Sequence, residues 1–229
     1  MPSGALRIRS LPGFACYQIA PLMPAFRPLH PQLRIEFLLT TERMASLDDG
    51  ADVAIVSGDL PSSSLVARRI ASSRWIICAS PSYLAEHGTP SSPAELDQHA
   101  CLNFSMPTKW NRWSGAGSGT NGRGNPRGGI VANQGDMLLA LALAGTGIVR
   151  LPDYQISPYL RAGGLVVLFP EHQDRVEEPI YVLYQNRRNL SPRIRVFLSF
   201  LDRAFARPPW LMESARVETD GRAQLLQSV

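Results

Sequence analysis

Side chains that could bind a small polar molecule gather where predicted strands and helices end. Ser10 and the pair Thr40 and Thr41 follow strand-like runs, and Asn133 with Gln134 stands just before a helix-like run. Their hydroxyl and amide groups can hold a carboxylate or another small anion, and the helix start adds backbone N–H donors. The same residue types also cap helices and form turns. Both interpretations stay open for each of these residues.

Other chemistry-bearing residues lack the context that catalysis or metal binding requires. Ser57 and the serines 62–64 have no identifiable base and no G-x-S-x-G elbow. The four histidines show no metal-ligand spacing: His30, His87, His99 and His172. Gly117, Gly119 and Gly122 match the dinucleotide fingerprint by letter, but no strand precedes them and no helix can follow. We therefore expect no catalytic residue, no metal and no cofactor.

Composition describes an ordinary globular chain of 229 residues with 45% hydrophobic content and a net charge of +4. No Lys/Arg-rich block argues for a polyanion partner, and no apolar run is long enough to span a membrane. Three cysteines without C-x-x-C spacing fit reduced thiols, and the N-terminus has no apolar signal segment. These features predict a cytoplasmic protein.

The elements that position these side chains are organised around residues 47–87. Two apolar, β-branched runs, 53–56 and 75–79, predict buried strands, with a polar loop that contains Gly58 and Asp59 between them. The second run leads into Ser80-Pro81, a helix start, and Gly88 follows the helix end. This pattern predicts that the chain leaves one structural unit here and enters a second.

The N-terminal part predicts strand and helix in alternation. Strands are expected at 5–11 and 33–40, and a short helix at 42–47. The apolar segment between the strands contains Pro21 and Pro24, which predict a helix that starts late or is kinked. Such alternation is typical of a parallel sheet, in which the strand ends border a ligand crevice.

The remaining chain predicts a second α/β unit and a return to the first. Ser92 and Glu95 have capping-box spacing, and residues 105–129 predict a mobile connection. Further strands are expected at 101–104, 129–132, 148–151, 165–169 and 180–184, and helices at 137–144, up to residue 161 and from 192 onward. The last helix carries one apolar face that should pack on the first unit's sheet.

Three stretches together resemble one protein family. They are Asp-Val-Ala-Ile at 52–55, Ser-Ser-Leu-Val-Ala-Arg-Arg at 63–69 and Cys-Ala-Ser-Pro-Ser-Tyr-Leu-Ala-Glu-His-Gly at 78–88. In this order, and followed by Asn-x-x-Asp at 133–136 and Ala-Leu-Ala-Gly-Thr-Gly-Ile-Val-Arg-Leu-Pro-Asp at 142–153, they resemble the effector-binding domain of LysR-type transcriptional regulators over about nine-tenths of the chain. Arg150 stands where the family more often has an apolar residue.

The resemblance implies an α/β fold of two Rossmann-like lobes, similar to type 2 periplasmic binding proteins. Lobe I would comprise residues 1–79 and 184–206, lobe II residues 80–183, and residues 207–229 a weakly patterned tail. A small metabolite would bind between the lobes and close them, and the hydroxyl, amide and apolar side chains of the predicted contacts favour a carboxylate or an aromatic acid. The resemblance supports effector contacts at the end of the first strand, at the end of the second strand and at the helix start 133–135, and the chemistry of the other side chains adds the rest. Arg150 could pair a carboxylate or equally form a surface salt bridge. The predicted effector contacts are Ser10, Leu11, Pro12, Phe14, Thr40, Thr41, Gly58, Asp59, Phe104, Asn133, Gln134, Gly135 and Arg150.

The resemblance also implies partners. A homodimer or tetramer would form through lobe I, residues 15–29, and DNA would be bound only through an N-terminal helix-turn-helix that this chain lacks. We therefore expect an excised regulatory domain, with a naturally truncated protein as the less favoured alternative. Two rival classes remain, a free-standing solute-binding protein and an enzyme on the same scaffold. The first predicts a secretory signal or lipid-anchored cysteine, and the second predicts an acid/base pair in the cleft.

Overall fold

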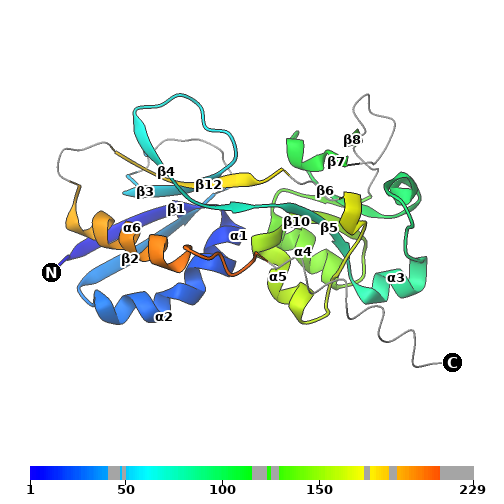
Figure 1. The fold of residues 1–229 in the computed structure, drawn as a ribbon, viewed down its shortest axis with the longest axis horizontal. Helices are drawn as coiled ribbons and strands as arrows, with labels where there is room; N and C mark the ends of the chain where they lie inside the picture. Colours follow the sequence, from blue (N-terminus) through cyan, green and yellow to red (C-terminus); the bar gives the residue numbers. More distant parts are fainter. Residues whose placement is uncertain are drawn as a thin grey trace.

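The described residues of the computed structural model are 1–40, 47, 50–114, 123–124, 129–172, 176–185 and 190–211, and they form two α/β lobes side by side (Figure 1). Each lobe contains one five-stranded sheet. The strand order is β2-β1-β3-β12-β4 in the first sheet and β11-β5-β10-β6-β9 in the second. We call the lobe around the first sheet lobe I and the lobe around the second sheet lobe II. The predicted two-lobe architecture is confirmed.

Lobe I combines a parallel half with an antiparallel half. β1 pairs parallel with both β2 and β3, whereas β12 pairs antiparallel with β3 and β4. The strands span Gly4–Ser10 (β1), Leu33–Leu39 (β2), Val53–Ser57 (β3), Leu65–Ser73 (β4) and Glu178–Gln185 (β12). The sequence did not predict β4, because this edge strand exposes arginines and lacks a continuous apolar run.

The segment after β1 is helical from Pro12 to Leu29, in five short pieces. They are α1 (Pro12–Phe14), the π-helical turn η1 (Ala15–Ile19), η2 (Ala20–Leu22), α2 (Met23–Phe26) and η3 (Arg27–Leu29). A late start was therefore the wrong prediction, since Pro12 occupies a first-turn position that tolerates proline. Pro21 and Pro24 are accommodated because the hydrogen-bonding pattern changes at each of them.

Lobe II has a mixed sheet flanked by helices. Its strands are β5 (Trp75–Ala79), β6 (Cys101–Phe104), β9 (Val131–Ala132), β10 (Ile148–Pro152) and β11 (Val166–Val167). Its helical elements are α3 (Pro81–His87), η4 (Pro93–Gln98), η5 (Lys109–Asn111), α4 (Gly135–Leu143), α5 (Asp153–Arg161) and η6 (Pro170–His172). A small separate pair is formed by β7 (Trp113–Ser114) and β8 (Arg123–Gly124).

Helix caps followed the sequence in one case and not in another. Ser80 Oγ accepts from the backbone N–H of Tyr83 at 3.4 Å, and Gly88 adopts a φ of 82° past the end of α3, both as predicted. The capping box of Ser92 and Glu95 was the wrong prediction. Ser92 makes no side-chain cap, and the Glu95 carboxylate instead accepts from Ser91 N and Ser91 Oγ.

The chain changes sheets between β4 and β5, at Arg74, and again before β12. Both points come earlier in the sequence than the predicted lobe limits after Ala79 and before Tyr184. The difference arises because Ser80-Pro81 marks a helix start and not the crossing itself. β5 and the first residues of β12 thus belong to sheets other than those expected.

The final helix α6 (Pro192–Ala204) packs on the sheet of lobe I, as predicted. Its buried side chains Ile194, Phe197, Leu198 and Leu201 join Leu6 and Ile8 of β1 in one core cluster. The short helix expected at 42–47 lies outside the described residues except for Leu47. None of the helices in the described part of the chain combines the length and the apolarity needed to cross a bilayer.

Candidate functional site

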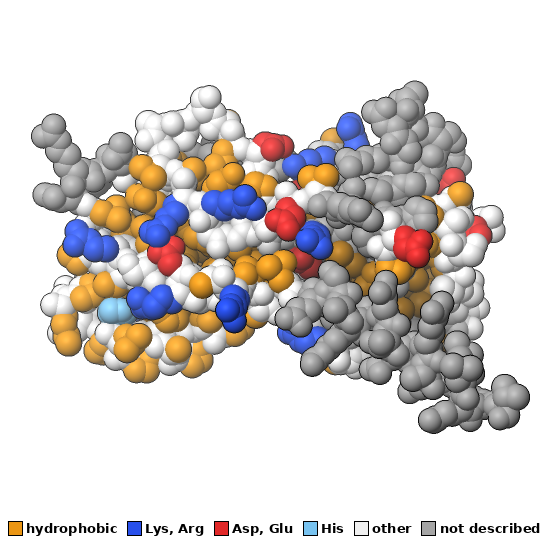
Figure 2. Space-filling model, viewed as in Figure 1, with side chains coloured by type: hydrophobic (Ala, Val, Ile, Leu, Met, Phe, Trp, Pro, Cys, Tyr) orange, Lys and Arg blue, Asp and Glu red, His pale blue; other side chains and the backbone are white. Residues whose placement is uncertain are grey.

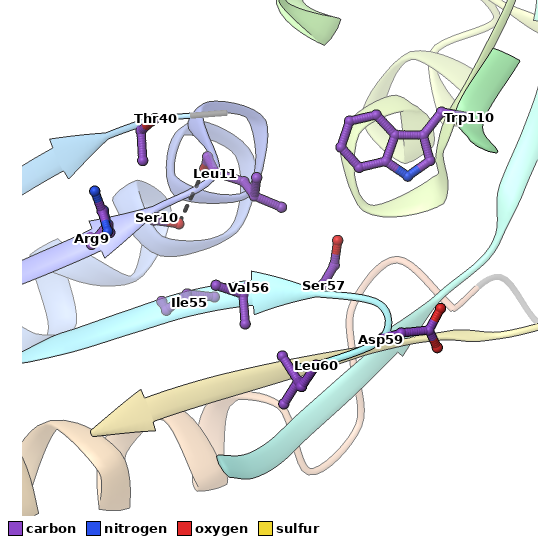
Figure 3. Close-up of a pocket in the computed structure, with 10 residues that line it drawn as sticks. All are labelled: Arg9, Ser10, Leu11, Thr40, Ile55, Val56, Ser57, Asp59, Leu60 and Trp110. Carbon is purple, nitrogen blue, oxygen red and sulfur yellow. Dashed lines mark hydrogen bonds between the residues drawn. The ribbon is translucent and has the colours of Figure 1, made fainter. Parts of the chain in front are cut away.

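Two cavities lie next to each other at the junction of the lobes. One of about 20 Å³ lies at the carboxyl ends of β1 and β3, and one of about 40 Å³ lies between α1 and the start of α4. Both are lined by Leu11, Ser57 and Trp110. Figure 3 shows Leu11 and Ser57 from lobe I facing the indole of Trp110 from lobe II. Trp110 therefore forms a wall shared by the two cavities.

Lobe I supplies hydroxyl groups at its strand ends, as the parallel arrangement predicts. The first cavity is lined by Ser10, Thr40 and Ser57, together with Arg9 and Asp59. Ser10 is buried, and its hydroxyl donates to the carbonyl oxygen of Leu11 at 3.1 Å. These side chains can contact a polar ligand because β1, β2 and β3 end at the same edge of the sheet.

Lobe II supplies an aromatic wall. Trp75 and Trp110 stack with their ring centroids 5.3 Å apart at 24°, and Phe104 lies 5.3 Å from Trp110. Thr108 Oγ1 accepts from the backbone N–H of Trp110 at 3.3 Å, so it caps the short turn that presents this side chain. Residues 105–129 were predicted to be a mobile connection. That prediction is wrong for Ser105–Trp113, which fold against the lobe, whereas residues 115–122 and 125–128 lie outside the described residues.

Arg150 supports this wall from behind. Its guanidinium carbon lies 5.2 Å from the ring centroid of Trp75, within cation–π range. Its Nη1 donates to the carbonyl oxygen of Trp110 at 3.0 Å. The side chain is buried and is not among the residues that line the two cavities. The arginine that departs from the family pattern thus orients the two tryptophans.

Glu178 joins the two lobes beside the cavities. Ser57 Oγ of lobe I donates to its Oε1 at 2.8 Å, and Trp75 Nε1 of lobe II donates to its Oε2 at 3.1 Å. Lys109 Nζ lies 3.7 Å from the same carboxylate and 3.3 Å from Asp59. A single buried carboxylate therefore positions a cavity-lining hydroxyl and the aromatic wall at once.

The helix start predicted as a ligand contact lies in the second cavity. Gln134 and Gly135 line it, and Gln155 lies opposite, donating through Nε2 to Asp136 Oδ1 at 2.9 Å. Burial raises the pKa of Asp136, while the hydrogen bond from Gln155 lowers it in part. A Cβ on Gly135 would approach Gln155 Oε1 to 3.0 Å, so the absent side chain allows the close packing of these elements.

The predicted contacts divide into two groups. The structure brings one group together around the two cavities: Ser10, Leu11, Pro12, Thr40, Asp59, Phe104, Gln134 and Gly135. It places Phe14, Gly58, Asn133 and Arg150 outside the lining of both cavities, and Thr41 lies outside the described residues. Phe14 differs from expectation because α1 begins at Pro12 and turns this ring into the core, 5.1 Å from Tyr154.

Sequence reasoning missed several lining residues. They are Arg9, Gly13, Ile55, Val56, Trp75, Pro152, Tyr154 and Gln155, together with Trp110. Most of them lie within strands and helices whose local pattern shows only burial. For Trp110 a signal did exist, since Thr108 precedes it as a possible cap in a stretch otherwise rich in Gly and Asn. Among the described residues, no group of three or more His, Cys, Asp or Glu side chains could hold a metal ion.

A two-lobe α/β fold with lining residues from both lobes defines the class of type 2 periplasmic-binding-protein-like domains. Within that class, residues 1–206 match the family model of the LysR substrate binding domain. The chain belongs to this family, which is a family of transcriptional regulators, and the solute-binding alternative is not supported.

Individual relatives agree with this placement. The HTH-type transcriptional regulator CrgA of Neisseria meningitidis is 33% identical over 204 residues, which cover 88% of this chain and 67% of that protein. The HTH-type transcriptional activator AaeR of Escherichia coli is 30% identical over 87% of this chain and 64% of its own length. The chain thus spans about two thirds of the length of these relatives.

Solved structures show the same fold. The CrgA regulatory domain from Neisseria meningitidis superposes with a TM-score of 0.82 at 32% identity, covering 89% of this chain and 100% of that chain. The regulatory domain of AphB in Vibrio vulnificus gives a TM-score of 0.71 at 27% identity, covering 87% and 98%.

Proposed function

We propose that this chain is the sensing domain of a transcriptional regulator and binds a small carboxylic acid between its lobes. The observation that carries the proposal is the pair of cavities whose walls come from both lobes and meet at Trp110. A ligand that touches both lobes has different affinities for different lobe arrangements, and only such a difference can shift their equilibrium. The proposed lobe limits are the predicted ones, moved to the points where the chain changes sheets.

The lining supports an acid as the effector. Hydroxyls of Ser10, Thr40 and Ser57 and the helix start at Gly135 offer donors, while Trp75 and Trp110 offer apolar ring faces. Cavities of about 20 and 40 Å³ hold only a few water-sized groups. A compact acid such as acetate would fit the observed arrangement. An aromatic acid would require the lobes or Trp110 to move outward first.

Thermal melts of this chain with acetate, succinate and benzoate test the proposal. A ligand that binds the folded form raises the melting midpoint in proportion to the logarithm of its concentration above Kd. We expect Ser10→Ala to abolish the shift and Ser62→Ala, a change at an exposed serine of lobe I, to leave it intact. A shift that survives Ser10→Ala would move the site elsewhere. No shift with any probe would favour a domain that works by oligomerisation.

We further propose that two copies of the chain associate through residues 15–29, as a dimer or as part of a tetramer. The outer side of this segment is exposed, and β2 is an edge strand of its sheet. The exposed hydrophobic side chains Leu29, Phe37 and Leu39 lie on these two elements. Leu29→Arg should reduce the mass measured by light scattering, whereas Val166→Arg, at an exposed position of lobe II, should not. An equal mass for both variants would contradict this interface.

Contact with DNA is proposed to belong to another part of the regulator. The relatives are named HTH-type regulators. Figure 2 shows Lys and Arg side chains spread over the lobe I half of one face, with acidic side chains between them. Within lobe I, ion pairs such as Arg7–Glu36 and Arg193–Asp52 neutralise part of the positive charge. We infer that the protein is cytoplasmic and not an enzyme, in keeping with the family's regulatory role.

A further inference from the structure

Residues 207–211 lie beyond the family match and belong to the stretch that was predicted to be a weakly patterned tail. The structure instead shows them crossing from the end of α6 in lobe I toward α5 in lobe II (Figure 1). Trp210 is only 1% exposed. We call this segment the strap. A tail that does not pack against the lobes would leave its tryptophan in solvent, so the burial of Trp210 requires an explanation.

The indole of Trp210 contacts aromatic rings of both lobes. Its centroid lies 5.4 Å from Phe205 and 5.8 Å from Phe14, which belong to lobe I. It lies 6.2 Å from Tyr154, at the start of α5 in lobe II. The rings meet edge to face, which is a favoured geometry for aromatic pairs. The strap therefore completes an aromatic cluster that neither lobe could form alone.

Two hydrogen bonds attach the strap at further points. Trp210 Nε1 donates to the carbonyl oxygen of Ser72 at 3.0 Å, two residues before the chain crosses to lobe II at Arg74. Arg161 Nη1, at the end of α5, donates to the carbonyl oxygen of Pro209 at 3.3 Å. The strap is thus bonded to the crossing segment and to lobe II, while α6 anchors its beginning to lobe I.

Other contacts between the lobes join η1 of lobe I to α5 of lobe II, the helix that the strap also contacts. Gln18 Nε2 of η1 donates to the carbonyl oxygen of Tyr154 at 2.6 Å, and Tyr17 lies 6.3 Å from Tyr159. Relative rotation of the lobes about the crossing segments would separate these pairs. Pro208 and Pro209 fix the φ angles at two positions of the strap, so the strap cannot readily change its backbone conformation to follow such a rotation.

We propose that the strap is a latch that holds the two lobes in one relative arrangement. Its main contact is the Trp210 indole, which packs among Phe14, Phe205 and Tyr154. Rotation of lobe II away from lobe I must withdraw the indole from this cluster and break the bond to Ser72. The latch therefore sets how readily the lobes separate, whichever ligand the cleft receives.

The chain offers a matched control in Trp113. This side chain is equally buried, but it belongs to a core cluster whose members all come from lobe II. Trp210→Phe and Trp113→Phe make the same chemical change, one between the lobes and one inside a lobe. Arg161→Ala is a third variant that removes only the bond to Pro209 and leaves every core side chain in place.

Hydrogen exchange and small-angle scattering of the whole chain test the latch. For Trp210→Phe we expect amides of Ser73, Arg74 and Tyr154 to exchange roughly tenfold faster, with a larger radius of gyration, while amides of β1 and β10 stay protected. Arg161→Ala should show the same pattern with a smaller amplitude. Trp113→Phe should affect lobe II alone.

Two outcomes would overturn the proposal. One is unchanged exchange at the crossing and an unchanged radius of gyration in both Trp210→Phe and Arg161→Ala. The other is faster exchange spread evenly through lobe I in Trp210→Phe, which would make the indole a core residue and not a latch. If Trp210→Phe does not fold, the Arg161→Ala data decide between latch and core.

Discussion

The buried carboxylate of Glu178 should contribute more to stability than that of its neighbour Glu177, and the two glutamates form a matched pair. The Glu178 side chain is 9% exposed and accepts from Ser57 Oγ and Trp75 Nε1. The Glu177 side chain is 39% exposed and accepts from Ser72 Oγ at 2.6 Å and from Arg74 at 3.2 Å. Replacing each by glutamine changes the same charge in two different environments.

The magnitudes follow from these environments. Hydrogen bonds to a buried charged group contribute about 1.5–3 kcal/mol each, and glutamine keeps one acceptor oxygen while its amide can donate to Ser57. We therefore expect Glu178→Gln to lower the free energy of unfolding by about 1–3 kcal/mol. Lys109, 43% exposed and 3.7 Å away, adds little. Glu177→Gln should cost less than about 1 kcal/mol, since exposed ion pairs are screened by solvent.

Guanidinium unfolding followed by tryptophan fluorescence measures both changes. The denaturation midpoints should separate clearly, with Glu178→Gln the lower, and the slopes of the unfolding transitions should stay alike. Equal midpoints would refute the claim that the inter-lobe contacts of Glu178 are stabilising. A midpoint above that of the parent chain would mean that desolvation of the carboxylate outweighs its hydrogen bonds.

Two further changes test other parts of the structure. Burial raises the pKa of Asp153 to about 6 from its usual 3.8, although Ser73 Oγ donates to the carboxylate. The folded state therefore binds this proton more tightly than the unfolded state does. Protonated Asp153 contributes its full stabilisation below pH 3.8, and this contribution is lost as the pH rises through 6. Asp153→Asn should remove about 2–3 kcal/mol of that pH dependence in urea titrations between pH 4 and 7, and a pH profile parallel to that of the parent chain would contradict the assignment. A Cβ at position 147 would lie 2.4 Å from the carbonyl oxygen of Ala100, so Gly147→Ala should lower the free energy of unfolding by about 2 kcal/mol or more, measured by the same method. Gly129→Ala, where a Cβ meets nothing within 4 Å, is its control, and equal costs for the two variants would show that the β6–β10 contact can relax.

Elements with an apolar run or a local start signal were predictable from the sequence. The strand at 53–57 and the helix after Ser80-Pro81 were found because burial of Val53–Ile55 and the cap on Tyr83 N depend on neighbouring residues alone. β4 was missed because its partner β12 is more than a hundred residues away, and an edge strand needs no apolar face of its own. Local pattern therefore predicts strands that carry an apolar run, including the edge strand β2, and misses a strand such as β4 whose exposed face is polar and whose partner is distant in the sequence.

The candidate site divides along the same line. Ser10, Thr40 and Gly135 could be predicted as lining residues because parallel strands and helix starts have known ends. The stacking of Trp75 on Trp110 could not be predicted, although Thr108 marks a turn before Trp110, since the two rings meet only after the segment that follows β6 has folded back. Phe14 is the opposite case, a predicted lining residue that lies in the core. Its place near a strand end indicated a ligand contact, yet the early helix start turned it toward Tyr154.

Family resemblance adds to local pattern but has a limit of its own, which Trp210 makes visible. A resemblance carries over only the positions that the family shares, and this tryptophan lies past residue 206, where the match ends. Its local sequence, Arg-Pro-Pro-Trp, shows no periodicity that would indicate burial. Only the distances to Phe14, Phe205 and Tyr154 reveal that it belongs to both lobes. Features that distinguish one regulator from its relatives are therefore to be sought among buried residues that lie outside the family match, as Trp210 does.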